Sequence, residues 1–323
     1  MNEYLSKSIY ITRLPLIIGP IFIHAVMNEG CTMQMLFHNL GMTSVPVLYL
    51  VSGYLFWGGY KSNKESLVGK YKSRIKSLVI PYLLWNLLAY VFFCIMGGLK
   101  WSQLITSFWG NAGSNAPADY PLWFVRSLIL IMPTIPFIYE LNRRKYLCHL
   151  SVLLMICWYF HCPSIFGHGT LQGLVLFNFG AYLRIQGVFD KKKLIPSKLF
   201  AVVSMIAWIT LNFLWTVATD EKYMVILENE ATVAGAFSYY SLGIMLPKEC
   251  SNNLAKVGKS SFFAYCFFAI ALHLIKNLFV DLDFTNFIGF LVLGISVLMV
   301  GVGLYYMLNR FTPRVCSILS GSR

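Results

Sequence analysis

The chain has 323 residues, of which 57% are hydrophobic and only 12% are charged, and its mean hydropathy is +0.64. This composition and the many long apolar runs exclude a soluble globular domain and predict an integral membrane protein. A net charge of +13 is compatible with nucleic-acid binding, but it is also compatible with the topology of a membrane protein. The placement of the charges along the chain decides between these two explanations.

The first apolar run covers residues 9–27 and contains two ionisable side chains, Arg13 and His24. No small-residue cleavage site follows it, so we expect this run to remain as the first span. The two residues are eleven positions apart. At about 100° per residue, a continuous helix places them on one face, roughly 16 Å apart along its axis. Because ionisable groups in a span usually face a protein interior or a wet cavity, this stripe is the candidate functional site. The structural alternatives are an Arg13 that anchors the membrane edge and a His24 that only packs.

Nine further apolar runs predict an all-α, polytopic transmembrane helical bundle of about ten spans, with both termini on one side. They cover residues 40–58, 77–97, 121–139, 147–162, 170–186, 198–218, 231–247, 261–280 and 286–309. Between them we expect an outer loop with His38 and Asn39, an exposed loop from Asn111 to Asp119, and an acidic outer loop from Asp220 to Glu230. No internal repeat or soluble appendage is visible, so residues 1–323 are interpreted as one domain.

The charges are distributed unevenly across these spans. With a cytoplasmic N-terminus, only four of the 26 Lys and Arg residues lie on or near the outer side, whereas eight of the 13 acids lie there. This asymmetry follows the positive-inside rule, so it predicts that both termini are cytoplasmic and removes the need for a nucleic-acid partner. The loop from Lys61 to Lys76 is the most basic, and as a whole it is interpreted as a topology signal that binds anionic membrane lipids.

Neither metal nor disulfide chemistry is predicted. The eight Cys residues include no C-x-x-C pair and most lie in apolar spans, which is typical of small buried hydrophobes. A Cys31–Cys162 bridge is the alternative for one pair. His161 and His168 do not have the neighbouring ligands of a zinc site, so we assign no metal.

Five sequence elements follow one another in the order found in the acyltransferase-3 family, which the chain resembles over most of its length. They are the Arg13 and His24 pair, Pro46 to Tyr54 ending in Ser-Gly-Tyr, Arg74 to Trp85 with Ile-Pro-Tyr-Leu-x-Trp, Leu122-Trp-Phe124, and Phe177 to Leu183. The resemblance rests on their shared order, because each element alone is weak. It implies a polytopic membrane acyltransferase that modifies cell-surface glycans.

Three positions depart from the pattern of that family. Tyr10 stands where members often have an acid three residues before the Arg. Ser77 stands where the basic segment often has its second Arg, and Lys76 is the nearest substitute. Phe268 stands where many members have a His in a late span, and His273 is the His that remains there.

The resemblance implies transfer of an acyl group, with acetyl expected, from cytosolic acyl-CoA to a hydroxyl of an extracytoplasmic or lipid-linked glycan. It also implies a multi-pass protein of the bacterial inner membrane. His24 would be the general base or a transient acyl carrier, with Arg13 at the mouth of the site on the donor side. Arg74, Lys72 and Lys76 are candidates for binding the phosphates of the donor. Arg74 is the foremost of them, because a guanidinium can donate two hydrogen bonds to phosphate oxygens at once.

Two further residues are candidates on the acceptor side. Arg126 would stabilise an oxyanion or bind an acidic acceptor, and its alternative is an interfacial anchor. Trp123 would stack on a sugar, although aromatic residues commonly form membrane-interface belts. Ser52 is interpreted as a small packing residue.

Two other classes of protein remain open from the sequence. A transporter or flippase of a lipid-linked glycan would also be basic inside and carry intramembrane charges, but no related halves are visible. A non-catalytic scaffold of acyltransferase ancestry is the third class, which Ser77 and Phe268 keep open. The sequence does not predict the oligomeric state.

Overall fold

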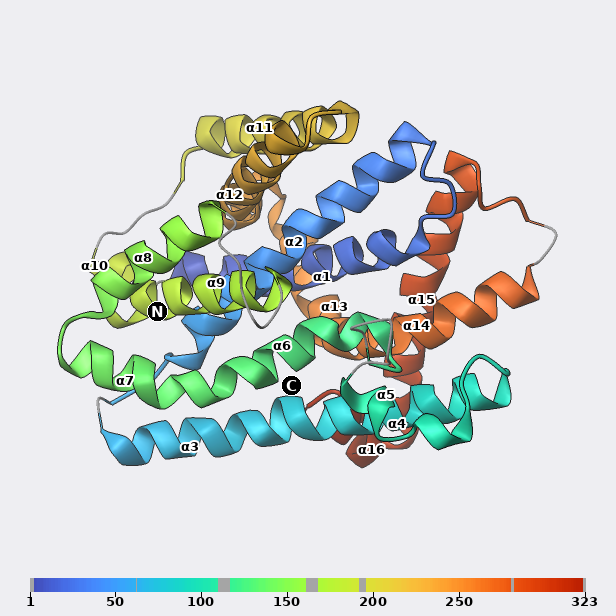
Figure 1. The fold of residues 1–323 in the computed structure, drawn as a ribbon, viewed down its shortest axis with the longest axis horizontal. Coiled ribbons are helices and arrows are strands. Elements are labelled where there is room, and N and C mark those ends of the chain that lie inside the picture. Colours follow the sequence, from blue (N-terminus) through green and yellow to red (C-terminus); the bar gives the residue numbers. More distant parts are fainter. Residues whose placement is uncertain are drawn as a thin grey trace.

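The computed structural model describes residues 3–61, 63–109, 117–160, 168–191, 196–279 and 282–321. Throughout these ranges the secondary structure is helical and contains no β-strand, which confirms the all-α prediction (Figure 1). The longer helices are α1 (Glu3–Ala25), α2 (Thr32–Phe56), α3 (Lys64–Arg74), α4 (Ile80–Ile95), α6 (Trp123–Ile131), α7 (Ile135–Arg143), α8 (Leu147–Tyr159), α9 (His168–Ile185), α11 (Lys198–Val217), α12 (Glu221–Met245), α13 (Lys248–Val257), α14 (Ser261–Leu278), α15 (Phe287–Phe311) and α16 (Pro313–Leu319). The short segments are α5 (Thr106–Trp109), α10 (Val188–Lys191), a π-helical turn η1 (Ile75–Val79), and the 3₁₀ turns η2 (Trp101–Gln103), η3 (Tyr120–Leu122), η4 (Met132–Thr134) and η5 (Gly258–Ser260).

Within the described ranges, seven helical segments are long and apolar enough to cross a membrane, which confirms a polytopic helical membrane protein. They are Ser8–Ala25, Thr32–Phe56, Lys64–Ile95, Tyr120–Arg143, Lys198–Val217, Glu249–Leu278 and Phe287–Phe311. The other three expected spans coincide with α8, α9 and α12. That these three cross the membrane stays a prediction, as does the cytoplasmic position of both termini.

The predicted outer loop around His38 and Asn39 is wrong, because both residues lie inside α2. Gln34, close to the start of α2, explains the early beginning of this helix. Its side-chain oxygen accepts the backbone N–H of Met27 at 3.0 Å, and its amide nitrogen donates to the carbonyl of Thr285 at 2.7 Å. One buried amide therefore ties the short α1–α2 connection to the start of α15.

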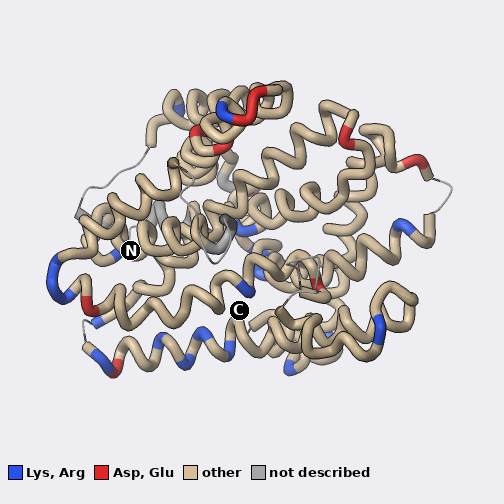
Figure 2. The backbone as a smooth tube through the Cα atoms, viewed as in Figure 1, with Lys and Arg blue, Asp and Glu red and all other residues tan. Residues whose placement is uncertain are grey.

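The basic segment from Lys61 to Lys76 is largely helical and not a loop. Helix α3 begins at Lys64 and continues through the π-helical turn into α4. Asn63 caps α3, because its side-chain oxygen accepts the backbone N–H of Ser66 at 2.8 Å. Figure 2 shows the cations spaced along α3, which continues into the bundle.

The acidic segment from Asp220 to Glu230 was also predicted as a loop, and it is helical from Glu221 onward. Asp220 is its N-cap, and its carboxylate accepts the backbone N–H of Lys222 at 2.8 Å. A carboxylate at this place also interacts favourably with the positive end of the helix dipole.

Helix α1 is the centre of the bundle and packs against α2, α12, α13, α14 and α15. Side chains on its inner faces are almost completely buried, Ile21 among them. Pro15 and Pro20 lie within the helix without interrupting it. Arg13 and His24 therefore share one continuous helix, as their spacing predicts.

Helices α2 and α9 approach each other at two glycines. A Cβ on Gly53 would lie 2.0 Å from the carbonyl oxygen of Phe177, and one on Gly180 would lie 2.1 Å from that of Leu50. Neither position has room for a side chain, so these glycines allow close helix packing. Figure 1 shows α1 and α2 between the α11–α12 pair on one side and the layer of α3, α4, α6 and α7 on the other.

Candidate active site

His24 lies in the last turn of α1, and its ring faces protein. The ring packs edge-to-face on Tyr120, with 4.8 Å between centroids, and lies 5.7 Å from the ring of Phe268. His38 on α2 and Lys276 on α14 also interact electrostatically with this ring. His24 is half-buried, so residues of three elements, η3, α14 and α2, lie around an imidazole that keeps part of its surface accessible.

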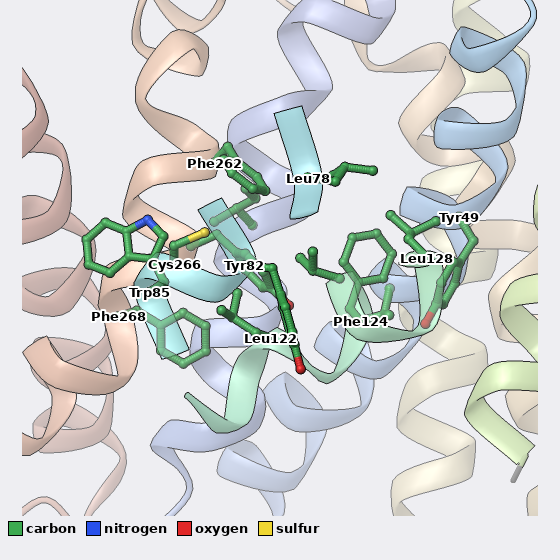
Figure 3. Packing of buried hydrophobic residues seen from close by; sticks show 14 of the residues in the cluster. Tyr49, Leu78, Tyr82, Trp85, Leu122, Phe124, Leu128, Phe262, Cys266 and Phe268 are labelled. Atoms are coloured by element: carbon green, nitrogen blue, oxygen red, sulfur yellow. The ribbon is translucent and has the colours of Figure 1, made fainter. Parts of the chain in front are cut away.

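The turn that carries Tyr120 is fixed to α14. The hydroxyl of Tyr265 donates a hydrogen bond to the carbonyl of Pro121, and Leu122 is completely buried. Figure 3 shows Leu122 between Phe268 and Tyr82 in the packed interior. The two aromatic neighbours of His24 are therefore held by the same contact between η3 and α14.

Arg13 lies near the middle of α1, eleven residues before His24. Its guanidinium lies over the ring of Tyr10, 4.5 Å from the centroid, which is the geometry of a cation–π contact. Its Cβ faces Gly258 of η5, where an added Cβ would lie 3.5 Å away. Arg13 is thus half-buried between α1 and the turn before α14, and part of it remains accessible.

Asp119 is an acid that the sequence prediction placed in an exposed loop, and this prediction is wrong. Its side chain is 0% exposed, and among the described residues neither carboxyl oxygen has a hydrogen-bond partner. Its backbone N–H donates to the side-chain oxygen of Asn86 at 3.2 Å. Burial raises the pKa of the Asp119 carboxyl well above its usual range. The segment 110–116, which held most of that predicted loop, lies outside the described residues.

Arg126 lies near Asp119 and also has unused hydrogen-bonding capacity. Its Nη1 donates to the carbonyl of Trp109, whereas its buried Nε has no partner in the part of the chain that the structure describes. The charges of Arg126 and Asp119 both act on the hydroxyl of Tyr82. We call Tyr82, Asn86, Asp119 and Arg126 the Asp119 cluster.

The candidates on the acceptor side are only partly brought together. Arg126 donates to the carbonyl of Trp109 and interacts electrostatically with Tyr49 and Tyr82. None of these described interactions brings it against the His24 ring. Trp123 is half-buried, one helical turn before Arg126 on α6. Tyr120 directly follows Asp119 in the chain and packs on the His24 ring. It therefore links His24 to the Asp119 cluster.

A second group of charges lies where α2, α3 and α9 meet. Arg74 is half-buried, with its guanidinium 5.8 Å from the centroid of Phe56, and Lys70 donates to the carbonyl of Gly58. The charges of Arg74 and Arg184 both act on Lys70. We call Lys70, Arg74 and Arg184 the basic cluster. Lys72 and Lys76, the other two candidates for the donor phosphates, are exposed on α3 and η1.

Arg184 is the member of the basic cluster that sequence reasoning missed. It directly follows the Phe177–Leu183 element, and this position is the only signal that could have found it. Its Nη1 donates to the hydroxyl of Tyr54 at 3.0 Å, which connects the element to Ser-Gly-Tyr on α2.

The family model described as an acyltransferase domain matches residues 10–306. The chain belongs to this acyltransferase-3 family. It is therefore a membrane acyltransferase. The matched region contains His24 and the members of both clusters. The comparisons with curated proteins and with solved structures find no match.

The structure shows what surrounds each of the three residues that depart from the acyltransferase-3 pattern. Tyr10 supplies a cation–π partner for Arg13 where members often have an acid. Ser77 lies against the C-terminal turn, where a Cβ on Gly321 would lie 2.4 Å from its carbonyl oxygen. Phe268 contacts His24 directly, so this departure lies at the candidate site itself.

His273 packs on the rings of Phe92 and Phe93, with 5.6 and 5.5 Å between centroids. His161 and Cys162, which concern the metal and disulfide predictions, lie outside the described residues, as does the side chain of His168.

Proposed function

We propose that this acyltransferase moves an acyl group, expected to be acetyl, from cytosolic acyl-CoA to a hydroxyl of an extracytoplasmic or lipid-linked glycan in a bacterial inner membrane. The observation that carries the proposal is the His24 ring, which lies inside the bundle against Tyr120 and Phe268 and shares a helix with Arg13. This one helix has a titratable base near one end and a guanidinium near its middle.

The donor binds at the end of the bundle that contains the basic cluster. Acyl-CoA carries several phosphates, which require cations, and Arg74 and Lys70 act on each other at this end. Exposed Lys72 and Lys76 add longer-range attraction that salt screens. Arg13 binds the donor where the acyl arm enters along α1.

His24 performs the proton transfer at the other end of α1. In the direct route its neutral imidazole takes the proton of the acceptor hydroxyl while that oxygen attacks the thioester carbon. The carbon–sulfur bond breaks, and the CoA thiolate leaves and takes up the proton. In the covalent route the imidazole nitrogen attacks the thioester carbon, the carbon–sulfur bond breaks, and the CoA thiolate leaves. The acceptor oxygen then attacks the acyl carbon, the bond from that carbon to the His24 nitrogen breaks, and the hydroxyl proton neutralises the CoA thiolate.

The Asp119 cluster binds the acceptor. The carboxyl of Asp119 and the Nε of Arg126 are buried without partners among the described residues. Leaving a buried polar group unsatisfied costs about 1–3 kcal/mol, so a ligand that supplies matching donors and acceptors recovers that free energy. The hydroxyls of a sugar supply both kinds of group, and Trp123 on the same helix offers a ring for stacking.

The test of this proposal is a product assay with membrane vesicles that contain the protein. Vesicles receive CoA carrying a labelled acetyl group, and both free CoA and labelled glycan are measured. The proposal predicts that the two products accumulate together and in equal amounts. A transporter of a lipid-linked glycan would instead move the glycan without CoA release, and that result would contradict the proposal. Mass spectrometry of envelope glycans with and without the gene identifies the acceptor.

A further inference from the structure

An apolar cavity of about 720 Å³ lies between α1, α2, α8, α9, α11 and α12. Its size falls within the range of about 300–1,000 Å³ that is typical of ligand sites. The lining is almost entirely aliphatic and aromatic. Two of its few hydroxyls are already bound within the protein, because Thr12 donates to the carbonyl of Ser8 and Ser8 donates to that of Tyr240.

Part of the cavity wall comes from two of the sequence elements that the chain shares with the family. Pro46, Leu50 and Tyr54 line it from α2, and Phe179 and Leu183 line it from α9. These belong to the Ser-Gly-Tyr element and the Phe177–Leu183 element. The glycines of the same elements hold α2 against α9, so close packing of the two helices shapes the cavity.

The cavity is separate from the stripe that carries the catalytic base. From α1 it is lined by Ser8, Ile9 and Thr12, which lie in the first half of the helix, whereas His24 lies in the last turn. Thr12 is also about 100° round the helix from Arg13. A molecule in the cavity therefore lies beside α1 on a different face and towards the end opposite His24.

Cations lie at the edge of the cavity. The guanidinium of Arg184 hydrogen-bonds the hydroxyl of Tyr54 and lies 5.2 Å from the centroid of its ring. Lys70 lies close enough for the charges of Arg184 and Arg74 to act on it. An apolar chamber with a cationic edge is complementary to an amphiphile that has an apolar chain and an anionic head.

We propose that the cavity holds an acyl chain of an anionic membrane phospholipid, with its phosphate against Arg184. A lipid-linked acceptor fits less well, because its phosphate at this edge would place the glycan at the end of α1 opposite His24. The chain of a long acyl-CoA fits less well for the same reason, since its thioester would lie away from the imidazole. The choice among these three occupants rests on the proposed reaction at His24, whereas lipid retention is measured without that reaction.

The test fills the cavity at Val233, which lines it from α12 and is 39% exposed. The matched control is Val300 on α15, which is 46% exposed and does not line the cavity. The full chain is purified in mild detergent, and co-purifying lipids are measured by native mass spectrometry. We expect Val233→Trp to lower retained phosphatidylglycerol about tenfold, the equivalent of about 1.4 kcal/mol, and Val300→Trp to leave it unchanged.

A second measurement needs no variant and so does not depend on the folding of Val233→Trp. Phosphatidylglycerol with a photoreactive group on its acyl chain is added to the wild-type protein, and cross-linked peptides are mapped. We expect cross-links on the lining residues of α9 and α12, and competition by unlabelled phosphatidylglycerol but not by phosphatidylcholine. Equal lipid retention in both Trp variants, or cross-links spread evenly over the exposed helices, would overturn the proposal. Competition by acyl-CoA alone would assign the cavity to the donor and also overturn it.

Discussion

The ring of Phe268 lies 5.7 Å from the ring of His24, at a position where many members of the family have a histidine. In this chain an apolar ring from α14 therefore packs near the imidazole of His24. Phe268 is completely buried and also contacts Tyr265 and Tyr120. It connects the ring contacts of His24 to the turn that is fixed by the hydrogen bond from Tyr265 to Pro121.

Phe268→Ala is expected to reduce both stability and kcat. Removing a buried phenyl ring typically costs about 3–5 kcal/mol, and here the His24 ring also loses a packing surface. Phe290→Ala is the matched control, because Phe290 is equally buried but contacts Phe22 and Phe37 instead of His24. Both variants should unfold at similar lower temperatures, whereas only Phe268→Ala should lower kcat at a temperature where both are folded. Equal kcat values in Phe268→Ala and Phe290→Ala would contradict a role of Phe268 in positioning His24.

Arg74→Gln is expected to raise the KM for acyl-CoA about tenfold or more with a smaller change in kcat, since a hydrogen bond to a charged group contributes about 1.5–3 kcal/mol. Lys76→Gln is the control, because Lys76 is exposed and an exposed ionic contact contributes only about 0–1 kcal/mol. Steady-state kinetics with varied donor concentration distinguish the two. A larger effect from Lys76→Gln would move the donor site onto the exposed face of η1.

Asp119→Asn is expected to change how stability depends on pH. The pKa of this carboxyl is raised in the folded protein, so the unfolded chain loses the proton first, above about pH 3.9. The stability of the wild type therefore falls as the pH rises from that value towards the folded-state pKa. The amide does not titrate, so the variant should become progressively more stable than the wild type over the same window. Melting temperatures measured at several pH values check this, and parallel curves would contradict it.

The same Asp119→Asn variant tests the role of the Asp119 cluster in acceptor binding. An amide has the shape of the carboxyl but cannot donate through an O–H group or carry a negative charge. We expect a higher KM for the acceptor and an unchanged KM for the donor. A rise in the donor KM alone would place this cluster on the donor side.

Gly180→Ala is expected to destabilise the bundle by about 1–3 kcal/mol through overpacking, because the added Cβ would lie 2.1 Å from the carbonyl of Leu50. Gly303→Ala is the control, since nothing on the described residues lies within 4 Å of its added Cβ. In a helix interior that change should stabilise by about 0.5–1 kcal/mol. Thermal unfolding in detergent measures both, and equal shifts would contradict the close α2–α9 contact.

The sequence predicted the fold class and the course of α1, because a long apolar run and a spacing of eleven residues report directly on one helix. It misplaced three helix starts, since the deciding contacts are single capping or bridging side chains. The hydrogen bonds of Gln34, Asn63 and Asp220 set these boundaries, whereas composition alone indicated polar loops. The first turns of α3 and α12 contain charged residues, so no apolar run in the sequence marks where these helices begin.

The candidate site was predicted only in part for a similar reason. Periodicity indicates which face of α1 carries His24, but it does not say which helices meet that face. Tyr120 and Phe268, separated by more than a hundred residues, come together only in the tertiary structure. Asp119 was missed because an Asp after Pro and Ala is typical of a turn, and its burial depends on packing against Asn86.

Loss of CoA release in His24→Ala is the most direct test of the account. The variant is compared with the wild type and with His273→Ala, whose ring packs on Phe92 and Phe93 away from the site. All three proteins are brought to the same level in membranes and given labelled acetyl-CoA. The account predicts that His24→Ala releases CoA at the background rate while His273→Ala keeps wild-type activity. Full activity of His24→Ala would contradict it.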